Sequence, residues 1–171
     1  IVTIGGQNFG TTASSGRMVT IGGHPATIVD WNPTAITVET PAGFGTVSVE
    51  VSSGGQTSLT VPTYTYEEPV IETCVPAHGP TLGGTNLAIH GRSFGPAAAG
   101  PVVVRINGVP ATNVQVLPAL DTIMCTAPAG IGQNLAVTVD VGGSPAVGSV
   151  TYDYDAPTAT GVSPSHRAPN T

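Results

Sequence analysis

The chain has 171 residues, and only 8% of them are charged, against about 25% in an average soluble protein. Its net charge is -6 with four basic residues, all of them Arg, so it offers no basic surface for phosphates and nucleic acid is not expected as a partner. No apolar run approaches the roughly 20 residues needed to cross a bilayer, so no membrane-spanning segment is predicted.

One phrase of the sequence occurs once in full and twice in part. The full copy covers residues 75–95, its second half recurs at 4–10, and its first half recurs at 163–166. Phe9 and Phe94 lie 85 residues apart, and Pro76 and Pro164 lie 88 apart. This period predicts two modules of roughly 85 residues, each large enough to bury a core. We call residues 1–66 module one, residues 67–155 module two and residues 156–171 the tail.

Apolar and polar residues alternate along the chain with a period of two, which is typical of half-buried strands. Paired glycines separate the runs and supply tight turns, and no ten-residue segment favours a helix. The expected strands cover residues 47–51, 57–66, 85–90, 102–106, 137–141 and 147–154. The sequence therefore predicts an all-β fold with two β-sandwiches in tandem. The expected core residues are Phe9, Ile21 and Ile36 with their counterparts Phe94, Ile106 and Ile123, and the alternating valines.

The ordered string of module two resembles the IPT/TIG domain. It reads Pro76-x-x-Gly79-Pro80-x-x-Gly83-Gly84-Thr85-x-x-x-Ile89-x-Gly91-x-x-Phe94, then Val104-x-Ile106-x-Gly108 and Ile123-x-Cys125-x-x-Pro128-x-Gly130. The resemblance covers residues 70–155, and residues 1–66 apart from the first strand. It implies an immunoglobulin-like sandwich, as in plexin-type receptors, Rel-type transcription factors and many surface proteins. Such domains serve as spacers and binding scaffolds without a common site. In the tail, Arg167 replaces the counterpart of Gly79 and departs from the pattern.

Module one has no counterpart of residues 70–83, so a sheet edge is expected to lie open and to recruit another strand. The tail carries the matching sequence and is predicted to be the first strand of a further module, donated to residues 1–66 of another copy. Val162 corresponds to Cys74, and Val38 corresponds to Cys125. The predicted assembly residues are Val162 and Pro164 in the tail and Ile1, Val2, Ile4 and Val38 in module one.

Two arrangements satisfy this pattern, and both give a head-to-tail rod. The chain is either a window on a long run of tandem modules or a separate subunit that donates its tail to a neighbour. The leading hypothesis is a structural subunit of an extracellular filament, fibre or stalk. The alternative is a cell-surface adhesin, a receptor or a carbohydrate-binding ectodomain module.

The two cysteines, Cys74 and Cys125, both fall in module two. A disulfide between them is predicted because a weakly charged, Lys-free, Thr-rich domain is typical of extracellular proteins. Two buried free thiols are the alternative.

Little in the sequence points to catalysis or to a cofactor, and no enzyme activity is expected. The four histidines form no recognisable triad with a nucleophile and a carboxylate. Acidic residues at the ends of the modules, Glu67, Glu68, Asp153 and Asp155, could brace a hinge through Ca²⁺, with a solvated hinge as the alternative. Trp31 is predicted to be half-buried at the edge of a core, with a sugar-stacking platform or an assembly contact as the alternative. Exposed Ser and Thr are candidate positions for O-linked glycans.

Overall fold

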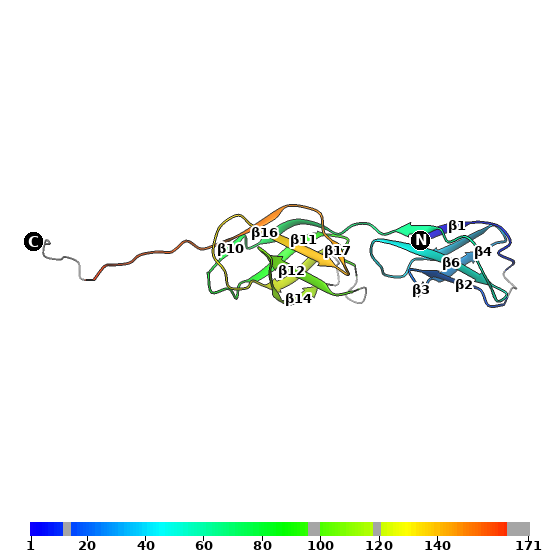
Figure 1. The fold of residues 1–171 in the computed structure, drawn as a ribbon, viewed down its shortest axis with the longest axis horizontal. Helices are drawn as coiled ribbons and strands as arrows, with labels where there is room; N and C mark the ends of the chain where they lie inside the picture. The colour runs from blue at the N-terminus through cyan, green and yellow to red at the C-terminus, as the bar shows by residue number, and fades with distance from the viewer. Residues whose placement is uncertain (12–14, 96–99, 118–120, 164–171) are drawn as a thin grey trace, which may run out of the picture.

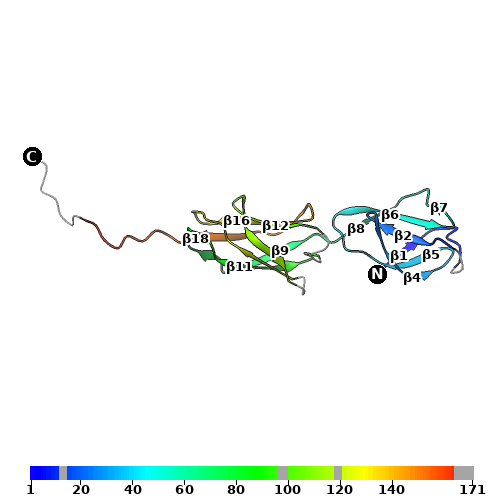
Figure 2. The ribbon, with the colours of Figure 1, turned by 90° about the horizontal axis from the view of Figure 1, so that it is seen from below.

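The computed structural model describes residues 1–11, 15–95, 100–117 and 121–163. Two sandwiches lie end to end, and the tail leaves module two at the end remote from module one (Figures 1 and 2). All regular elements of the described residues are strands, which confirms the all-β prediction. The described residues contain no helix that could cross a lipid bilayer.

The described residues of module one form eight strands in two layers. They are β1 (Val2–Gly5), β2 (Met18–Ile21), β3 (His24–Pro25), β4 (Thr27–Trp31), β5 (Ala35–Glu39), β6 (Thr46–Ser53), β7 (Gln56–Thr57) and β8 (Thr63–Thr65). One sheet has the order β1-β5-β4, and the other has the order β3-β2-β6-β7 with β8 paired to β6. The first sheet therefore ends on β1.

Module two repeats this plan with additional strands at its start. They are β9 (Val70–Val75), β10 (His78–Gly79), β11 (Asn86–Arg92), β12 (Val102–Ile106), β13 (Val109–Pro110), β14 (Thr112–Val116), β15 (Thr122–Thr126), β16 (Leu135–Val141), β17 (Ser144–Pro145) and β18 (Val150–Tyr154). One sheet has the order β14-β15-β11-β9, and the other has the order β10-β18-β16-β12-β13 with β17 beside β16. The β-strands β9 and β10 therefore close the two sheets on one side of the sandwich.

Each sandwich encloses its own hydrophobic core, built from the inward-facing residues of the alternating strands. The predicted core residues Ile21, Ile36, Ile106, Ile123 and Phe94 are all buried. Phe9 differs from its counterpart Phe94, because it is only half-buried. The difference arises because Phe9 lines an open groove of module one, described below.

Two predicted strands depart from expectation. Residues 57–66 are not one strand, because only residues 56–57 and 63–65 are strands. Between them Ser58 and Pro62 are hydrogen-bonded to β6, and residues 59–61 have no main-chain partner among the described residues. The described part of the tail, residues 156–163, is exposed and forms no strand. Within this chain the matching position of module two is already occupied by β9, so the tail has no sheet edge of its own module to join.

Candidate functional site

The candidate site is the open edge of β1 in module one. In the part of the chain that the structure describes, β1 pairs only with β5, with Val2 opposite Val38 and Ile4 opposite Ile36. The other edge of the strand faces no neighbour. A short, uncharged edge with free main-chain groups is a template for an additional strand.

Module two shows what occupies this edge when the sandwich is complete. Its strand β11 is the counterpart of β1, and it pairs on one side with β15 and on the other with β9. Within β9, Ile71 and Cys74 are buried and so contribute to the core. The strand therefore both satisfies the edge of β11 and covers apolar side chains.

Strand β9 of module two lies between two walls. One wall is the edge of β11, and the other is the segment that precedes β18. The Ile71 N–H donates to the Val147 carbonyl at 2.9 Å, and the Val147 N–H donates to the Pro69 carbonyl at 2.9 Å. The counterpart of Val147 in module one is Leu59, since Ser58 and Ala146 make the same backbone bond to β6 and β16. Leu59 is fully exposed. The main chain of Leu59 has no partner among the described residues.

A groove of about 370 Å³ lies between these two walls in module one. Its lining includes Ile4, Gly6 and Phe9 from the β1 side, and Val51, Leu59 and Pro62 from the opposite side. No charged residue lines it. The groove therefore lies in the place that the first residues of β9 fill in module two, and it suits a neutral extended segment.

Gly6 is one reason why a main chain can approach this groove closely. Its counterpart Gly91 passes so near the carbonyl oxygen of Val70 that an added Cβ would collide with it. At Gly6 the three atoms nearest to an added Cβ all belong to the ring of Phe9, and none belongs to a main chain. Leu59 and Gly6 were not identified from the sequence as assembly residues, although the repeat offset would have placed both of them opposite β9.

The predicted assembly residues fall into three groups. Val38 and Ile4 are buried in the core beneath the open edge, while Val2 is half-buried and Ile1 is exposed. Val162 in the tail is 76% exposed and contacts no sheet. Pro164 lies outside the described residues. The structure thus brings Ile4 and Val38 together in module one and leaves Val162 apart from them.

The predicted disulfide requires correction, because Cys74 and Cys125 are free, buried thiols. Cys74 pairs with Ile89 and Cys125 pairs with Leu87, so strand β11 lies between the two cysteines. Strands in a sheet are about 4.8 Å apart, which places the Cα atoms more than about 9 Å apart and beyond the reach of a disulfide. Burial raises the pKa of Cys74 to about 11, and burial together with the nearby Cys74 raises the pKa of Cys125 to about 11. We therefore expect both thiols to react slowly in the folded chain.

The acidic residues at the ends of the modules do not gather into a cation site in the described residues, where no cluster of three potential ligands is found. Asp155 pairs with His78, Asp153 accepts a bond from the Asn134 N–H, and Glu67 accepts one from the Ser93 hydroxyl. These carboxylates therefore fix local turns and the link between the modules.

Trp31, Tyr66 and Tyr154 lie in or against the hydrophobic cores of the two sandwiches. Trp31 is only 2% exposed, and its indole N–H donates to the Phe9 carbonyl at 3.0 Å, so it is a core residue rather than a stacking platform. The Tyr66 and Tyr154 hydroxyls donate to the carbonyls of Pro41 and Pro128 at 2.8 and 2.7 Å. Burial, and then the adjacent tyrosine, raises the pKa of both phenols.

A model of the IPT/TIG domain matches residues 1–66 and again residues 69–154. The chain belongs to the IPT/TIG family. The two matches coincide with the two sandwiches, and they confirm the resemblance seen in the sequence. In module two β9 pairs with the outer edge of β11, whereas among the described residues no strand pairs with the outer edge of β1.

Solved structures with a similar fold include a plexin extracellular region and a Bacteroides protein. A full extracellular region of plexin A4 matches with a TM-score of 0.47 and 21% identity, over 88% of this chain and 16% of that chain. A protein described as SGBP-B from a complex xyloglucan utilization locus in Bacteroides uniformis matches with a TM-score of 0.43 and 18% identity, over 88% of this chain and 44% of that one. The IPT/TIG chain thus spans less than half the length of these proteins. Similarities of this size carry no information about what it binds.

Proposed function

We propose that this chain is a non-catalytic structural repeat of an extracellular filament, fibre or stalk, in which copies assemble head to tail by strand complementation. The observation that carries the proposal is the open edge of β1 beside a neutral groove, in the place that β9 fills in module two. The occupant is the tail of a second copy. A weakly charged surface rich in Ser and Thr supports the extracellular setting.

The register of the complex follows from the repeat. In module two, Ala88, Ile89, His90, Gly91 and Arg92 face Val75, Cys74, Thr73, Ile71 and Val70. The corresponding pairs would be Thr3 with Ser163, Ile4 with Val162, Gly5 with Gly161, Gly6 with Ala159 and Gln7 with Thr158. In this register Val162 and Ala159 point into the core of module one. Burial of Val162, which is exposed in the single chain, contributes about 1.5 kcal/mol or more.

The groove and residues 156–163 of the tail are both free of charged side chains. In module two the Arg92 guanidinium is hydrogen-bonded to the Glu72 carboxylate across β9 and β11. The counterparts of these residues are Gln7 and Thr160, which are both neutral. Residues 156–163 of the tail contain no charged side chain. The tail would therefore enter the groove without leaving an unpaired charge.

The direction of the tail favours an open assembly. The tail leaves module two at the end opposite to module one (Figures 1 and 2), as the linker leaves module one toward module two. The donor and the acceptor surfaces lie on different parts of the chain, so the contact is heterologous. A heterologous contact that does not close into a ring generates a rod.

The test is the association of the 171-residue chain, followed by analytical ultracentrifugation and negative-stain microscopy. We expect concentration-dependent linear oligomers. Val162→Asp in the tail should abolish them, because Val162 is 76% exposed in the single chain and its counterpart Cys74 is buried in module two. Leu59→Asp in the groove should only weaken them, because Val147, the counterpart of Leu59, stays 46% exposed in the complete module two. Val109→Asp, on an exposed hairpin, is the matched control and should assemble normally. A wild-type chain that stays monomeric at high concentration, or assembly that Val162→Asp leaves unchanged, would overturn the proposal.

The native polypeptide distinguishes donation between chains from a continuous run of modules. Denaturing electrophoresis of material from its source should show a band near 17.0 kDa if separate subunits donate their tails. A very large band would mean that the same strand is supplied by a covalently joined module. In both cases the groove of module one is filled by a segment of the type of residues 157–163.

A second candidate function is recognition, as an adhesin, a receptor or a carbohydrate-binding ectodomain. Membership of the IPT/TIG family, which plexin-type receptors and many surface proteins share, favours it. Every Phe, Tyr and Trp of the chain lies in the described residues, and each is buried or half-buried, so no aromatic platform for stacking a sugar ring is exposed. Binding to a glycan array by the Val162→Asp chain would support recognition, because this variant separates ligand binding from assembly.

A further inference from the structure

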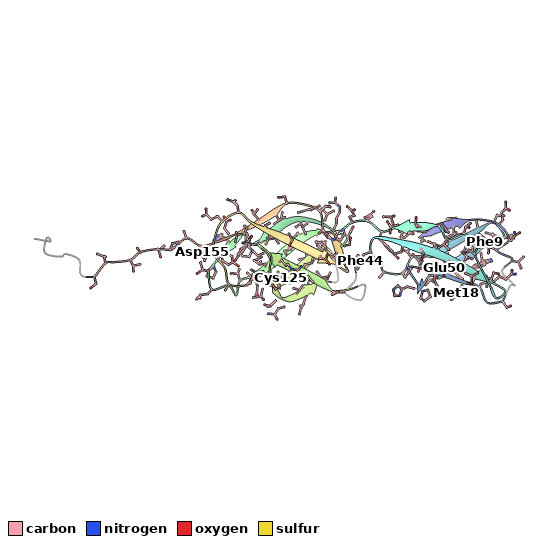
Figure 3. The ribbon with its side chains drawn as sticks, in the orientation of Figure 1. Phe9, Met18, Phe44, Glu50, Cys125 and Asp155 are labelled. Atoms are coloured by element: carbon pink, nitrogen blue, oxygen red, sulfur yellow. The ribbon has the colours of Figure 1, made fainter. Side chains whose placement is uncertain are left out.

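The joint between the two modules contains one inserted aromatic ring. Phe44 of module one packs against the core residues of module two. Its ring lies over Gly142, where an added Cβ would collide with it, and it is 3.6 Å from the Cβ position of Gly100. Figure 3 shows Phe44 between the two sandwiches. The absence of a side chain at Gly142 therefore makes room for this ring.

Phe44 occupies a defined place relative to the linker. It directly precedes Gly45, whose carbonyl accepts a hydrogen bond of 2.9 Å from the N–H of Tyr66, the last residue before the linker. In module two the Tyr154 N–H donates to the Gly132 carbonyl at 2.8 Å, directly before the tail. The residue in front of Gly132 is Ile131. It is 80% exposed, a large apolar side chain at the root of the tail.

The surface that receives Phe44 also has a counterpart. The Gly142 N–H donates to the Pro101 carbonyl at 2.9 Å, and the Gly54 N–H donates to the Ser15 carbonyl at 2.9 Å. Both glycines begin a turn with nearly equal φ values of 60° and 58°. At Gly54, however, no atom lies within 4 Å of an added Cβ. The turn between β6 and β7 that contains it lies toward the end of module one remote from module two (Figure 2).

The connecting segments have equal reach. Residues 67–69 separate Tyr66 from Val70, and residues 155–157 separate Tyr154 from Thr158, the counterpart of Val70. Both segments end in a proline, Pro69 and Pro157. A tail seated in the groove would therefore bring Ile131 as close to the next module as the linker brings Phe44.

We propose that Ile131 of one copy docks on the Gly54 turn of the next copy and forms the second joint of the rod. The inference rests on the proposed function, because the tail must first occupy the groove of module one. In this joint the apolar Ile131 side chain packs on the turn at Gly54, which carries no side chain. The Phe44 ring packs on Gly142 in the same way within the chain. Strand donation holds the two copies together, and the Ile131 contact fixes the orientation between them.

A photo-cross-linking experiment tests the contact directly. Ile131 is replaced by the photoreactive residue benzoylphenylalanine in two formats, namely the separate 171-residue chain and a covalent tandem of two copies. In the tandem, Thr171 is joined to Ile1 through a Gly-Thr linker. These two residues correspond to Gly84 and Thr85, which separate the equivalent positions in module two. After irradiation, peptide mapping should find the cross-link at residues 53–55 of the next copy. The same photoreactive residue at Val109, on an exposed hairpin, should give no such product.

A quantitative arm uses substitutions at both sides of the joint. Ile131→Asp should raise the dissociation constant for copy-to-copy association about tenfold, the factor expected for the loss of one partly buried apolar side chain. Gly54→Asn should do the same, because Asn tolerates the left-handed backbone but covers the turn. Gly55→Asn is the matched control, since Gly143, the counterpart of Gly55, has no neighbour within 4 Å of an added Cβ.

The outcomes separate the two proposals. If separate chains stay monomeric while the tandem cross-links at residues 53–55, the joint stands and strand donation between chains is wrong. If chains associate through the tail but neither format cross-links there, the joint is wrong and the proposed function stands. Equal dissociation constants for wild type, Ile131→Asp and Gly54→Asn would also overturn the joint.

Discussion

The carbonyl oxygen of Val70 in β9 lies against the backbone of Gly91 in β11, and a Cβ on Gly91 would overlap that oxygen. This contact lies at the point where β9 shifts register against β11, between His90 and Gly91. The pairing of β9 with β11 therefore depends on the absence of a side chain at Gly91. Gly6 keeps the same feature in module one.

Substitution of Gly91 by Ala should destabilise module two by about 3 kcal/mol, because the added methyl group meets backbone rather than a movable side chain. The measurement is the unfolding transition of module two in differential scanning calorimetry. Gly5→Ala is the control, because open space surrounds its Cβ position and little change is expected. Equal melting temperatures for Gly91→Ala and wild type would contradict the assigned approach of β9.

The two buried thiols predict a loss of stability at alkaline pH. Their pKa values rise from 9.0 to about 11 in the fold, so the thiols stay protonated when those of the unfolded chain ionise. Their contribution is complete below pH 9 and is lost between pH 9 and about 11. It amounts to about 3 kcal/mol for each thiol. The double variant Cys74→Val with Cys125→Val, which copies the residues of Val162 and Val38, should flatten this part of the stability profile.

The same thiols should be inaccessible in the native chain. Titration with a thiol reagent is expected to detect them only after unfolding, since both are buried. A chain mass that shows two hydrogens lost, or immediate reaction in the folded state, would show that the pairing of β9, β11 and β15 is wrong.

Three tyrosines of the closing strands should respond differently to loss of the hydroxyl. Tyr154→Phe and Tyr66→Phe should each cost about 1 kcal/mol in their own module, because each hydroxyl donates to a proline carbonyl. The hydroxyl of Tyr152 is buried without a partner among the described residues, so Tyr152→Phe should be neutral or stabilising. Chemical denaturation of the three variants checks this order. A loss at Tyr152 as large as that at Tyr154 would contradict it.

Phe44 should couple the two modules. Phe44→Ser removes the ring that packs on module two, so we expect a lower melting temperature of module two and a wider range of inter-module angles in small-angle scattering. Ile131→Ser is the matched control at the free end of the same chain. It should change neither quantity in the monomer, because Ile131 is exposed there.

The sequence predicted the architecture well because its repeat carries two independent signals. Alternating valines define the strands, and paired glycines define the turns between them. The core positions Ile21 and Ile106, or Ile36 and Ile123, could be recognised in each copy for the same reason.

What the sequence did not predict depends on the pairing of strands across the sheet. Cys74 and Cys125 have suitable spacing along the chain, but they flank β11 instead of facing each other. The second wall of the groove was missed because Leu59 reads as part of a continuous strand, whereas it lies in an unpaired segment. The role of Phe44 was missed because its counterpart, Ile131, is a different residue type and the joint exists only in three dimensions.

The equal lengths of the connecting segments 67–69 and 155–157 have a consequence for diffraction. If copies assemble into the proposed rod and both joints have the same geometry, a screw operation relates single sandwiches, and each chain supplies two almost equivalent steps. An oriented specimen should then give strong meridional intensity at the axial rise of one sandwich, and only weak intensity at twice that rise. The weak reflections would measure how far the Phe44 joint and the Ile131 joint differ.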